Sequence, residues 1–414
     1  MSKSNLGILV LDNFKDFGQK VQEHLAKIRN TNENYLVSSD GVRFSNGEGK
    51  YLITSSVREK NLFILSDIGN YELSYEYHGQ KHILSPDEHF QDIIRVISAT
   101  CGHASKISVV TPLLYESRQD RRKSRESLDC AVALQELERM GVTNIITFDA
   151  HNPNVCNAIP NLSFDNFYPT NTILEKIVDD NPDIFDNMLV ISPDISAMER
   201  ARYYAEIIGC DVGVFYKRRD LSKVVNGKNP IVAHVYMGTD VKDKNVFVVD
   251  DMIASGGSVL EVSEELRKRG AKKIYLIATF ALFTEGIEKF KTAYENGLFN
   301  GLYTTNLSYI PKEYTSLEWF NAVDLSEMVA TIIDKLDKRE SLSSLFNGRK
   351  EIMDKIKKKR WHLVPVLFCY FGNWCRFFFV IINFYKIWNI NILRTKLIGR
   401  PQLWFCSKNI NISN

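Results

Sequence analysis

The sequence lacks the features that mark export, thiolate metal sites and two common nucleotide-binding loops. Its N-terminus has no charged segment followed by an apolar stretch, so we expect no export signal. Four of its seven cysteines, Cys101, Cys130, Cys156 and Cys210, are widely spaced, fit no metal-binding pattern and suit a reducing compartment. Neither Gly-x-x-x-x-Gly-Lys-Ser/Thr nor Gly-x-Gly-x-x-Gly occurs, so any nucleotide site must be built in another way. Together these absences predict a cytoplasmic protein.

A strong net charge is also missing. The 414 residues have a formal net charge of +2, which argues against a dedicated nucleic-acid or membrane-surface protein. Charge is nevertheless uneven, because residues 361–414 contain three Lys and three Arg but no Asp or Glu. The rest of the chain therefore has an excess of acidic residues.

The C-terminal segment is apolar from His362 to Tyr385, but Arg376 interrupts it. A central Arg costs about 2.5–3.5 kcal/mol on membrane-insertion scales. We interpret residues 361–414 as a read-through or frame-shifted extension that is poorly ordered or loosely packed. Anchoring to a membrane is the alternative, and we expect no membrane partner for the rest of the chain.

Apolar runs alternate with segments of helical periodicity along most of the chain. This alternation predicts an α/β protein with two halves, each a mostly parallel sheet covered by helices on both faces. We expect the first half at residues 1–167, completed by a helix within 318–340, and the second at 168–317. Residues 67–88 are polar and rich in Tyr, which indicates a surface insertion, and residues 347–414 form an extension. The predicted strands are residues 6–11, 61–66, 106–114, 144–148, 188–191, 211–216, 246–249, 273–279 and 302–308.

The most informative stretch runs from Val246 to Val259. Four apolar residues predict a buried strand, and the carboxylates of Asp250 and Asp251 follow it. The loop Ala254-Ser255-Gly256-Gly257-Ser258 then leads into a helix predicted from Val259. Backbone N–H groups at a helix start favour an anion, and glycines allow close approach to a phosphate. We expect a sugar phosphate here, although an ordinary strand-to-helix turn with an acidic cap is the alternative.

Several charged residues follow predicted strands and should therefore meet at one edge of a sheet. They are His151, Asp194, Lys217 and Asp250. A His and an Asp beside a substrate rich in phosphate can share a Mg²⁺ with phosphate oxygens. Taken singly, His151 is also compatible with a core or capping role and Asp194 with a turn. The basic clusters at 118–125 and 217–219 suit phosphate binding or a solvated surface.

From about Leu6 to Phe346, the chain resembles ribose-phosphate pyrophosphokinases, and its motifs occur in that family's order. The resemblance implies an adenine-contacting loop at Phe44, Asn46, Gly47 and Glu48, which in the family reaches into a neighbouring subunit's site. It implies an ATP-binding segment at Arg118, Gln119 and Asp120, Mg²⁺ ligands at His151 and Asp194, and catalytic residues Lys217 and Arg219. It also implies ribose-5-phosphate contacts from Arg219, Asp250, Asp251, Ala254, Ser255, Gly256, Gly257 and Ser258.

The implied fold is a pair of phosphoribosyltransferase-like domains. The implied reaction moves the diphosphoryl group of ATP to C1 of ribose 5-phosphate, giving phosphoribosyl pyrophosphate and AMP. The implied cofactor is Mg²⁺, and the implied assembly is a homodimer that builds a hexamer. No nucleic-acid partner is expected.

Three positions depart from the family pattern. Ala254 stands where the phosphate loop usually opens with Asp, Asn46 replaces a common Asp, and Ser196-Ala197 replaces paired glycines. Two other functions stay open, of which Ala254 motivates the first and the paired halves disfavour the second. One is a non-catalytic regulatory subunit, and the other is a phosphoribosyltransferase, which needs only one loop-bearing domain.

Overall fold

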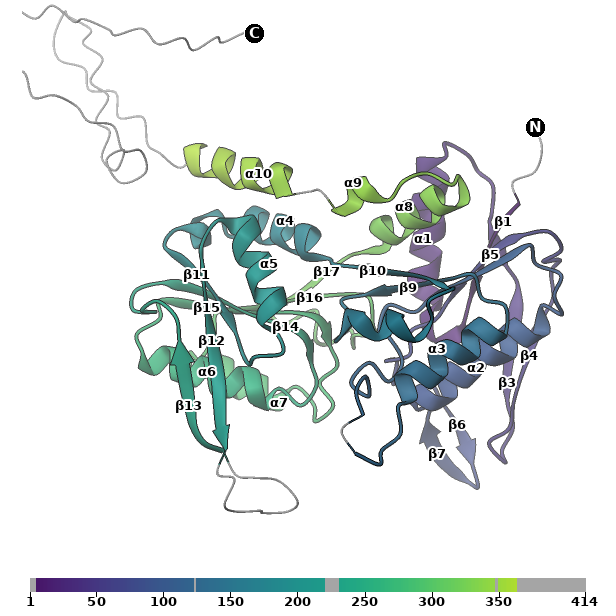
Figure 1. Ribbon diagram of the computed structural model, residues 1–414, viewed down its shortest axis with the longest axis horizontal. Helices are drawn as coiled ribbons and strands as arrows, with labels where there is room; N and C mark the ends of the chain where they lie inside the picture. The colour runs from purple at the N-terminus through teal and green to yellow at the C-terminus, as the bar shows by residue number, and fades with distance from the viewer. Residues whose placement is uncertain (1–4, 123, 220–230, 347–348, 363–414) are drawn as a thin grey trace, which may run out of the picture. The chain divides into compact units, whose positions relative to one another are not determined.

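The computed structural model describes residues 5–122, 124–219, 231–346 and 349–362 (Figure 1). In this part of the chain, six parallel strands form a first sheet in the order β10-β9-β8-β5-β1-β2. The strands are β1 (Leu6–Val10), β2 (Leu36–Val37), β5 (Asn61–Leu65), β8 (Lys106–Val110), β9 (Asn144–Phe148) and β10 (Ser163–Phe167).

Helices cover both faces of the first sheet because both faces of its strands are apolar. Ile8 packs in the core beneath α1 (Lys15–Ile28), whereas its neighbour Leu9 packs in the core beneath α2 (Pro86–Ala99) and α3 (Asp129–Arg139). Such near-continuous apolar strands are typical of parallel sheets buried on both sides. Helix α2 begins with a capping box formed by Ser85 and Glu88.

A second sheet follows in the order β13-β12-β11-β14-β15-β16-β17, and of its described strands only β12 and β13 pair antiparallel. Helices α4 (Thr170–Asp180) and α5 (Met198–Ile208) pack on one core, and α6 (Gly257–Lys268) and α7 (Glu288–Glu295) on the other. The predicted fold class, with two mostly parallel sheets flanked by helices, is confirmed. The strands are β11 (Met188–Ser192), β12 (Asp211–Arg219), β13 (Ile231–Met237), β14 (Asn245–Ile253), β15 (Lys273–Ala281), β16 (Gly301–Thr305) and β17 (Phe320–Val323).

Smaller elements complete the described chain. Two antiparallel hairpins, β3–β4 and β6–β7, stand apart from the large sheets. The elements are β3 (Ser39–Arg43), β4 (Gly49–Ile53), β6 (Ser74–Tyr77), β7 (Gln80–Ile83), η1 (Asp12–Phe14), η2 (Pro153–Ala158), η3 (Pro182–Phe185), α8 (Ser326–Asp337), α9 (Ser343–Phe346) and α10 (Arg349–His362).

Several elements differ from the sequence-based expectations. The strands predicted at 106–114 and 302–308 end at Val110 and Thr305, and β10 and β17 were not predicted. Three further differences concern elements that hold predicted site residues. Strand β14 continues to Ile253 because Met252 still lies opposite Phe280 of β15, so the two carboxylates belong to the strand. Helix α6 begins at Gly257, inside the glycine loop, and not at Val259. Strand β12 extends to Arg219 because β13, which we did not predict, pairs alongside it.

Residues 318–340 divide between the two sheets. Strand β17 adds to the edge of the second sheet, whereas α8 packs on α1 of the first. Arg29 of α1 lies 2.6 Å from Asp334 and 2.8 Å from Asp337, and these side chains are only 7–16% exposed. Lys20 makes a similar contact with Asp324, but its side chain is 52% exposed. The Arg29 cluster is thus the desolvated part of this helix pair.

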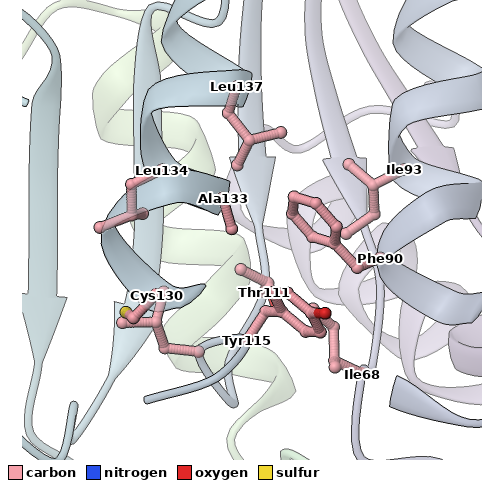
Figure 2. Close-up of a pocket in the computed structure, with 10 residues that line it drawn as sticks. Ile68, Phe90, Ile93, Thr111, Tyr115, Cys130, Ala133, Leu134 and Leu137 are labelled. Atoms are coloured by element: carbon pink, nitrogen blue, oxygen red, sulfur yellow. The ribbon is translucent and has the colours of Figure 1, made fainter. Parts of the chain in front are cut away.

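A small apolar cavity lies between α2 and α3 (Figure 2). Its lining includes Phe90, Tyr115, Cys130 and Leu137, and its volume of about 10 Å³ admits no more than one water molecule. Burial raises the pKa of Cys130 to about 12, so its thiol is protonated at neutral pH. The cavity therefore has neither the size nor the polar groups of a nucleotide site.

Helix α10 belongs to the same compact unit as both sheets. Its Ile352 and Ile356 are buried in the core, and Lys355 pairs with Asp179 at 2.9 Å. The extension predicted at 347–414 therefore includes a helix that packs on the core. Its remainder, residues 363–414, where we expect a poorly ordered tail or a membrane anchor, lies outside the described residues. None of the described helices is both long enough and apolar enough to cross a bilayer.

The order of strands in the first sheet reverses between β1 and β5, where open α/β sheets usually bind ligands. Asp67, which follows β5, is fully buried there. Its carboxylate accepts hydrogen bonds from the Tyr309 N–H at 2.7 Å and the Ser308 hydroxyl at 3.0 Å, both beyond β16. Burial raises the pKa of Asp67 to about 7, although those hydrogen bonds oppose the shift. The crevice of the first sheet is therefore filled by a loop of the second.

Replacing Arg29 tests the contact between α1 and α8. Arg29→Met leaves Asp334 and Asp337 buried without their guanidinium, so we expect the free energy of unfolding to fall by about 3 kcal/mol in urea denaturation. Lys20→Ala is the matched control, because an exposed pair contributes less than about 1 kcal/mol. Equal losses of stability in the two variants would show that the Arg29 cluster contributes no more to the α1–α8 contact than the exposed Lys20 pair.

Asp67 predicts a particular dependence of stability on pH. Because its folded pKa of about 7 exceeds that of an unfolded Asp, its contribution is fully present at low pH and is lost as pH rises through 7. Relative to Asp67→Asn, the wild-type free energy of unfolding should fall by about 3 kcal/mol from pH 5 to pH 8.

Asp324→Asn provides the control for this pH series. Burial alone raises the pKa of Asp324, but hydrogen bonds from Lys20 and Ser326 outweigh it and hold the pKa below its usual range. Its contribution is therefore lost only as pH falls below about 4. The difference between this variant and wild type should be the same at pH 5 and pH 8. If the stability difference between Asp324→Asn and wild type changed with pH as much as that of Asp67→Asn, the pH dependence could not be assigned to Asp67.

Candidate active site

The site is built on β14, which has two adjacent carboxylates near its C-terminal end. Asp251 is buried, whereas Asp250 is partly exposed, and the Asp251 N–H donates to the Asp250 carboxylate at 2.9 Å. Burial and the charge of Asp251 raise the pKa of Asp250 well above its usual range. Burial also acts to raise the pKa of Asp251, but the His151 hydrogen bond and the charge of Arg200 outweigh it and hold that pKa low. The pKa values of the two carboxyl groups are therefore shifted in opposite directions.

His151 reaches this pair from the other sheet. It follows β9, and its Nδ1 lies 2.8 Å from the Asp251 carboxylate. That hydrogen bond raises the pKa of His151, while burial and the charges of Arg118 and Arg200 oppose the shift. A carboxylate on Nδ1 leaves Nε2 as the nitrogen that can bind a metal ion.

A second link between the sheets involves Asp149, two residues before His151. Asp149 follows β9 with a positive φ of 45°, a strained conformation for a non-glycine residue. Its buried carboxylate accepts from Arg200 of α5 at 2.7 Å and from the Thr279 hydroxyl of β15 at 2.6 Å. Burial raises the pKa of Asp149, and the charge of Arg200 opposes the shift. These contacts fix the turn from which His151 projects.

The predicted ATP-binding segment is held beside His151. The Asp120 carboxylate accepts a hydrogen bond from Asn152 at 2.5 Å, and Arg118 is close enough for its charge to lower the pKa of His151. The side chains of Arg118 and Gln119 are exposed. The structure thus brings Arg118, Asp120 and His151 to one place.

Asp194 follows β11, the strand next to β14. Its Oδ1 accepts from the Ser196 hydroxyl at 2.5 Å and from the Ala197 N–H at 3.1 Å, and its charge acts to raise the pKa of Asp250. Ser196 and Ala197, where the family pattern has glycines, therefore orient this carboxylate. The order of strands in the second sheet reverses between β11 and β14, so Asp194 and Asp250 flank the crevice expected to bind a ligand.

The predicted phosphate loop connects β14 to α6. Gly256 has φ +81° and lies against Phe290, where a Cβ would come within 2.3 Å of the ring. Gly257 begins the helix, no side chain caps the start of α6 in the described structure, and no acidic residue lies in its first turn. The N–H groups of this turn and its partial positive charge suit a phosphate.

Lys217 lies toward the C-terminal end of β12, at the edge of the second sheet where β11 and β14 also end. Ser192 at the end of β11 lies opposite Val214 of β12, so Lys217 comes three residues beyond that point. Lys217 pairs with His234, and the register shifts between Arg218 and Arg219. The loop that follows, residues 220–230, lies outside the described residues.

The predicted adenine loop lies elsewhere. Phe44, Asn46, Gly47 and Glu48 connect β3 to β4, and their described contacts are with one another and with the β6–β7 hairpin. The Asn46 amide donates to the Glu48 carboxylate at 2.9 Å, and the Phe44 side chain is exposed. Within one chain the described contacts do not join this loop to His151.

The donor groups fit a magnesium ion that is completed by substrate. Within the described residues, no three His, Cys, Asp or Glu side chains are arranged to hold a metal by themselves. Within the described residues, the Nε2 of His151 and the second oxygen of Asp194 accept or donate no hydrogen bond to protein. Mg²⁺ is commonly held by one or two protein groups together with phosphates and water.

Sequence reasoning missed three residues that organise the site. Arg200 and Thr279 hold Asp149, and Asn152 holds Asp120. Asn152 is adjacent to a recognised motif and could have been singled out for that reason. Arg200 and Thr279 have no such signal, because each is distant in sequence from the residue it contacts.

Comparisons with known proteins agree with this geometry. A sequence model described as the N-terminal domain of ribose phosphate pyrophosphokinase matches residues 6–141, and one described as the phosphoribosyl transferase domain matches residues 169–296. A ribose-phosphate pyrophosphokinase of Vibrio parahaemolyticus is 28% identical over 310 residues, covering 74% of this chain and 90% of that protein. The corresponding protein of Chlorobaculum tepidum is 27% identical over 324 residues, covering 78% and 90%.

A solved structure extends the comparison to the fold. Phosphoribosylpyrophosphate synthetase from Mycobacterium smegmatis superposes with a TM-score of 0.65 and 19% identity, covering 81% of this chain and 99% of that one. The fold is thus a two-domain α/β architecture with a phosphoribosyltransferase-type domain. The two domain models match this chain one after the other, and the named relatives match most of its length. The chain therefore belongs to the ribose-phosphate pyrophosphokinase family, whose members are enzymes.

The phosphate loop generates a stability test. Gly256→Ala forces a Cβ into the Phe290 ring at a positive φ, so we expect a loss of about 2–4 kcal/mol in the free energy of unfolding. Gly257→Ala meets no atom within 4 Å and should change stability by less than about 1 kcal/mol. If both variants unfold alike, the close approach at Gly256 is not what shapes the loop.

Proposed function

We propose that the protein is a ribose-phosphate diphosphokinase. It transfers the β,γ-diphosphoryl group of ATP to the C1 hydroxyl of ribose 5-phosphate, and it releases AMP and phosphoribosyl pyrophosphate. The observation that carries this proposal is the hydrogen bond between His151 and Asp251, which joins the ATP-side segment of the first sheet to the sugar-phosphate strand of the second. Family membership supports the reaction class.

The residues suggest how the substrates are held. The 5-phosphate of the sugar binds the first turn of α6 together with Ser255 and Ser258, and Asp250 accepts hydrogen bonds from the ribose hydroxyls. Ala254 removes one carboxylate from this loop, but the backbone donors remain.

ATP lies on the other side of the crevice. Arg118 and Gln119 contact its phosphates, and the Phe44–Glu48 loop contacts adenine, reaching the site of a neighbouring subunit in a homodimer that assembles further into a hexamer. His151 and Asp194 would hold a Mg²⁺ ion, which would neutralise charge on the phosphates when bound. Asp251 orients the imidazole, and Ser196 and Ala197 orient the carboxylate.

The transfer itself is an in-line displacement at the β-phosphorus. The C1 oxygen of the sugar forms the new bond to phosphorus and loses its proton, while the bond to the α-phosphate oxygen breaks and AMP leaves. Lys217 and Arg219, at the end of β12, stabilise the charge that develops on the transferring group. Protein groups therefore act by positioning and by electrostatics.

The activity test measures AMP release from ATP by the purified full-length chain. We expect release to require both ribose 5-phosphate and Mg²⁺, and Lys217→Ala to lower kcat by about 10²–10³-fold. Arg202→Ala, an exposed position on α5, is the control. ATP-independent consumption of phosphoribosyl pyrophosphate would indicate a phosphoribosyltransferase instead, and absence of any activity would favour a regulatory subunit.

The role of Asp251 predicts a change in metal dependence. Asp251→Asn removes the charged partner that orients His151, so the Mg²⁺ concentration for half-maximal activity should rise by about 10–100-fold. Measuring this at saturating ATP and ribose 5-phosphate separates metal binding from substrate binding. An unchanged Mg²⁺ requirement would show that Asp251 does not act through the imidazole.

A further inference from the structure

The β6–β7 hairpin presents an aromatic face. Tyr75 and Tyr77 lie two residues apart on β6, and His82 lies opposite Tyr75 on β7. The ring of His82 is 5.2 Å from Tyr75 and 5.8 Å from Tyr77, and the two Tyr rings are 6.2 Å apart. Alternate residues of a strand share a face, so these three side chains form one surface of the hairpin.

This aromatic face contacts the Phe44–Glu48 loop. A Cβ built on Gly47 would lie 3.1 Å from the ring of Tyr77 and 3.5 Å from the hydroxyl of Tyr75, and Gly47 has φ +90°. The His78 N–H donates to the carbonyl of Ser45 at 3.3 Å. Two separate points of the loop are therefore in contact with the hairpin.

Helix α2 fixes the hairpin in turn. Glu88, in its first turn, accepts hydrogen bonds from the Tyr75 hydroxyl at 3.0 Å and the Ser85 N–H at 2.9 Å, and its carboxylate lies 3.0 Å from Nε2 of His82. Burial acts to raise the pKa of Glu88, but these hydrogen bonds outweigh it and lower the pKa. The carboxylate is therefore charged at neutral pH and holds both strands of the hairpin.

The same helix also holds the strand that leads into the loop. One turn beyond Glu88, Asp92 pairs with Arg43 at 2.6 Å, and both side chains are largely buried. The guanidinium of Arg43 lies 5.8 Å from the centre of the Tyr75 ring. Figure 1 shows the β3–β4 and β6–β7 hairpins extending from the same side of the first sheet. Helix α2 thus connects both hairpins into one support.

We propose that the β6–β7 hairpin is a positioning element for the Phe44–Glu48 loop and determines how tightly the protein binds the adenine of ATP. The inference rests on the proposed function. Holding the loop in one conformation before binding reduces the entropy lost when nucleotide binds. Tyr77 is the central positioning residue, because its ring lies against Gly47 at the tip of the loop.

Steady-state kinetics of the full-length chain test this proposal. Tyr77→Ala should raise the KM for ATP by about 5–30-fold, while kcat and the KM for ribose 5-phosphate change by less than about twofold. Tyr77→Phe keeps the ring and should restore the wild-type KM. Lys81→Ala, an exposed change on the same hairpin, is the matched control. His82→Ala, which removes the contact with Glu88, should raise the KM for ATP in the same direction.

Calorimetric titration with ATP separates this proposal from the proposed function. If the wild-type chain releases no AMP but binds ATP, a weaker affinity in Tyr77→Ala than in Lys81→Ala supports the hairpin role, and equal affinities overturn it. In an active enzyme, an unchanged KM for ATP or equal losses in kcat and both KM values would overturn it. Wild-type protein that does not bind ATP would overturn both proposals.

Discussion

The hydrogen bond between His151 and Asp251 is the interaction on which the site depends. It joins residues 100 positions apart in the chain and belonging to different sheets. The Asp251 carboxylate needs such a hydrogen-bonding partner, because its side chain is only 3% exposed and a buried charge without a hydrogen bond is costly. The neighbouring contacts of Asp149 with Arg200 and Thr279 hold the turn that brings His151 there. The alignment of the nucleotide side with the sugar side therefore follows from a few buried polar contacts, and the sheets provide the frame for them.

The point at which the strand order reverses has different contents in the two sheets. In the second, the crevice between β11 and β14 contains Asp194, Asp250 and the start of α6. In the first, the crevice between β1 and β5 is filled by Asp67 and the loop with Ser308 and Tyr309. The same position of the fold thus holds candidate ligand-binding groups in one sheet and a contact with the other domain's loop in the other.

The sequence allowed the large elements to be located because buried parallel strands are runs of apolar residues. Runs such as residues 61–66 and 144–148 agree with β5 and β9. Strand β13 was missed because it is held by antiparallel pairing with β12, which no local pattern indicates. The candidate site residues could be placed at strand ends, but the partner of each could not. The pairing of Asp251 with His151, and of Asp149 with Arg200, depends on how two sheets meet, which only the folded chain specifies.

The loop after β16 that occupies the first crevice has a consequence for dynamics. Swinging one sheet away from the other would expose the carboxylate of Asp67, and it would also separate Asp149 from Arg200. Hinge motion of whole domains is therefore disfavoured during turnover. Any exclusion of water from the substrates would then fall to smaller rearrangements within each sheet.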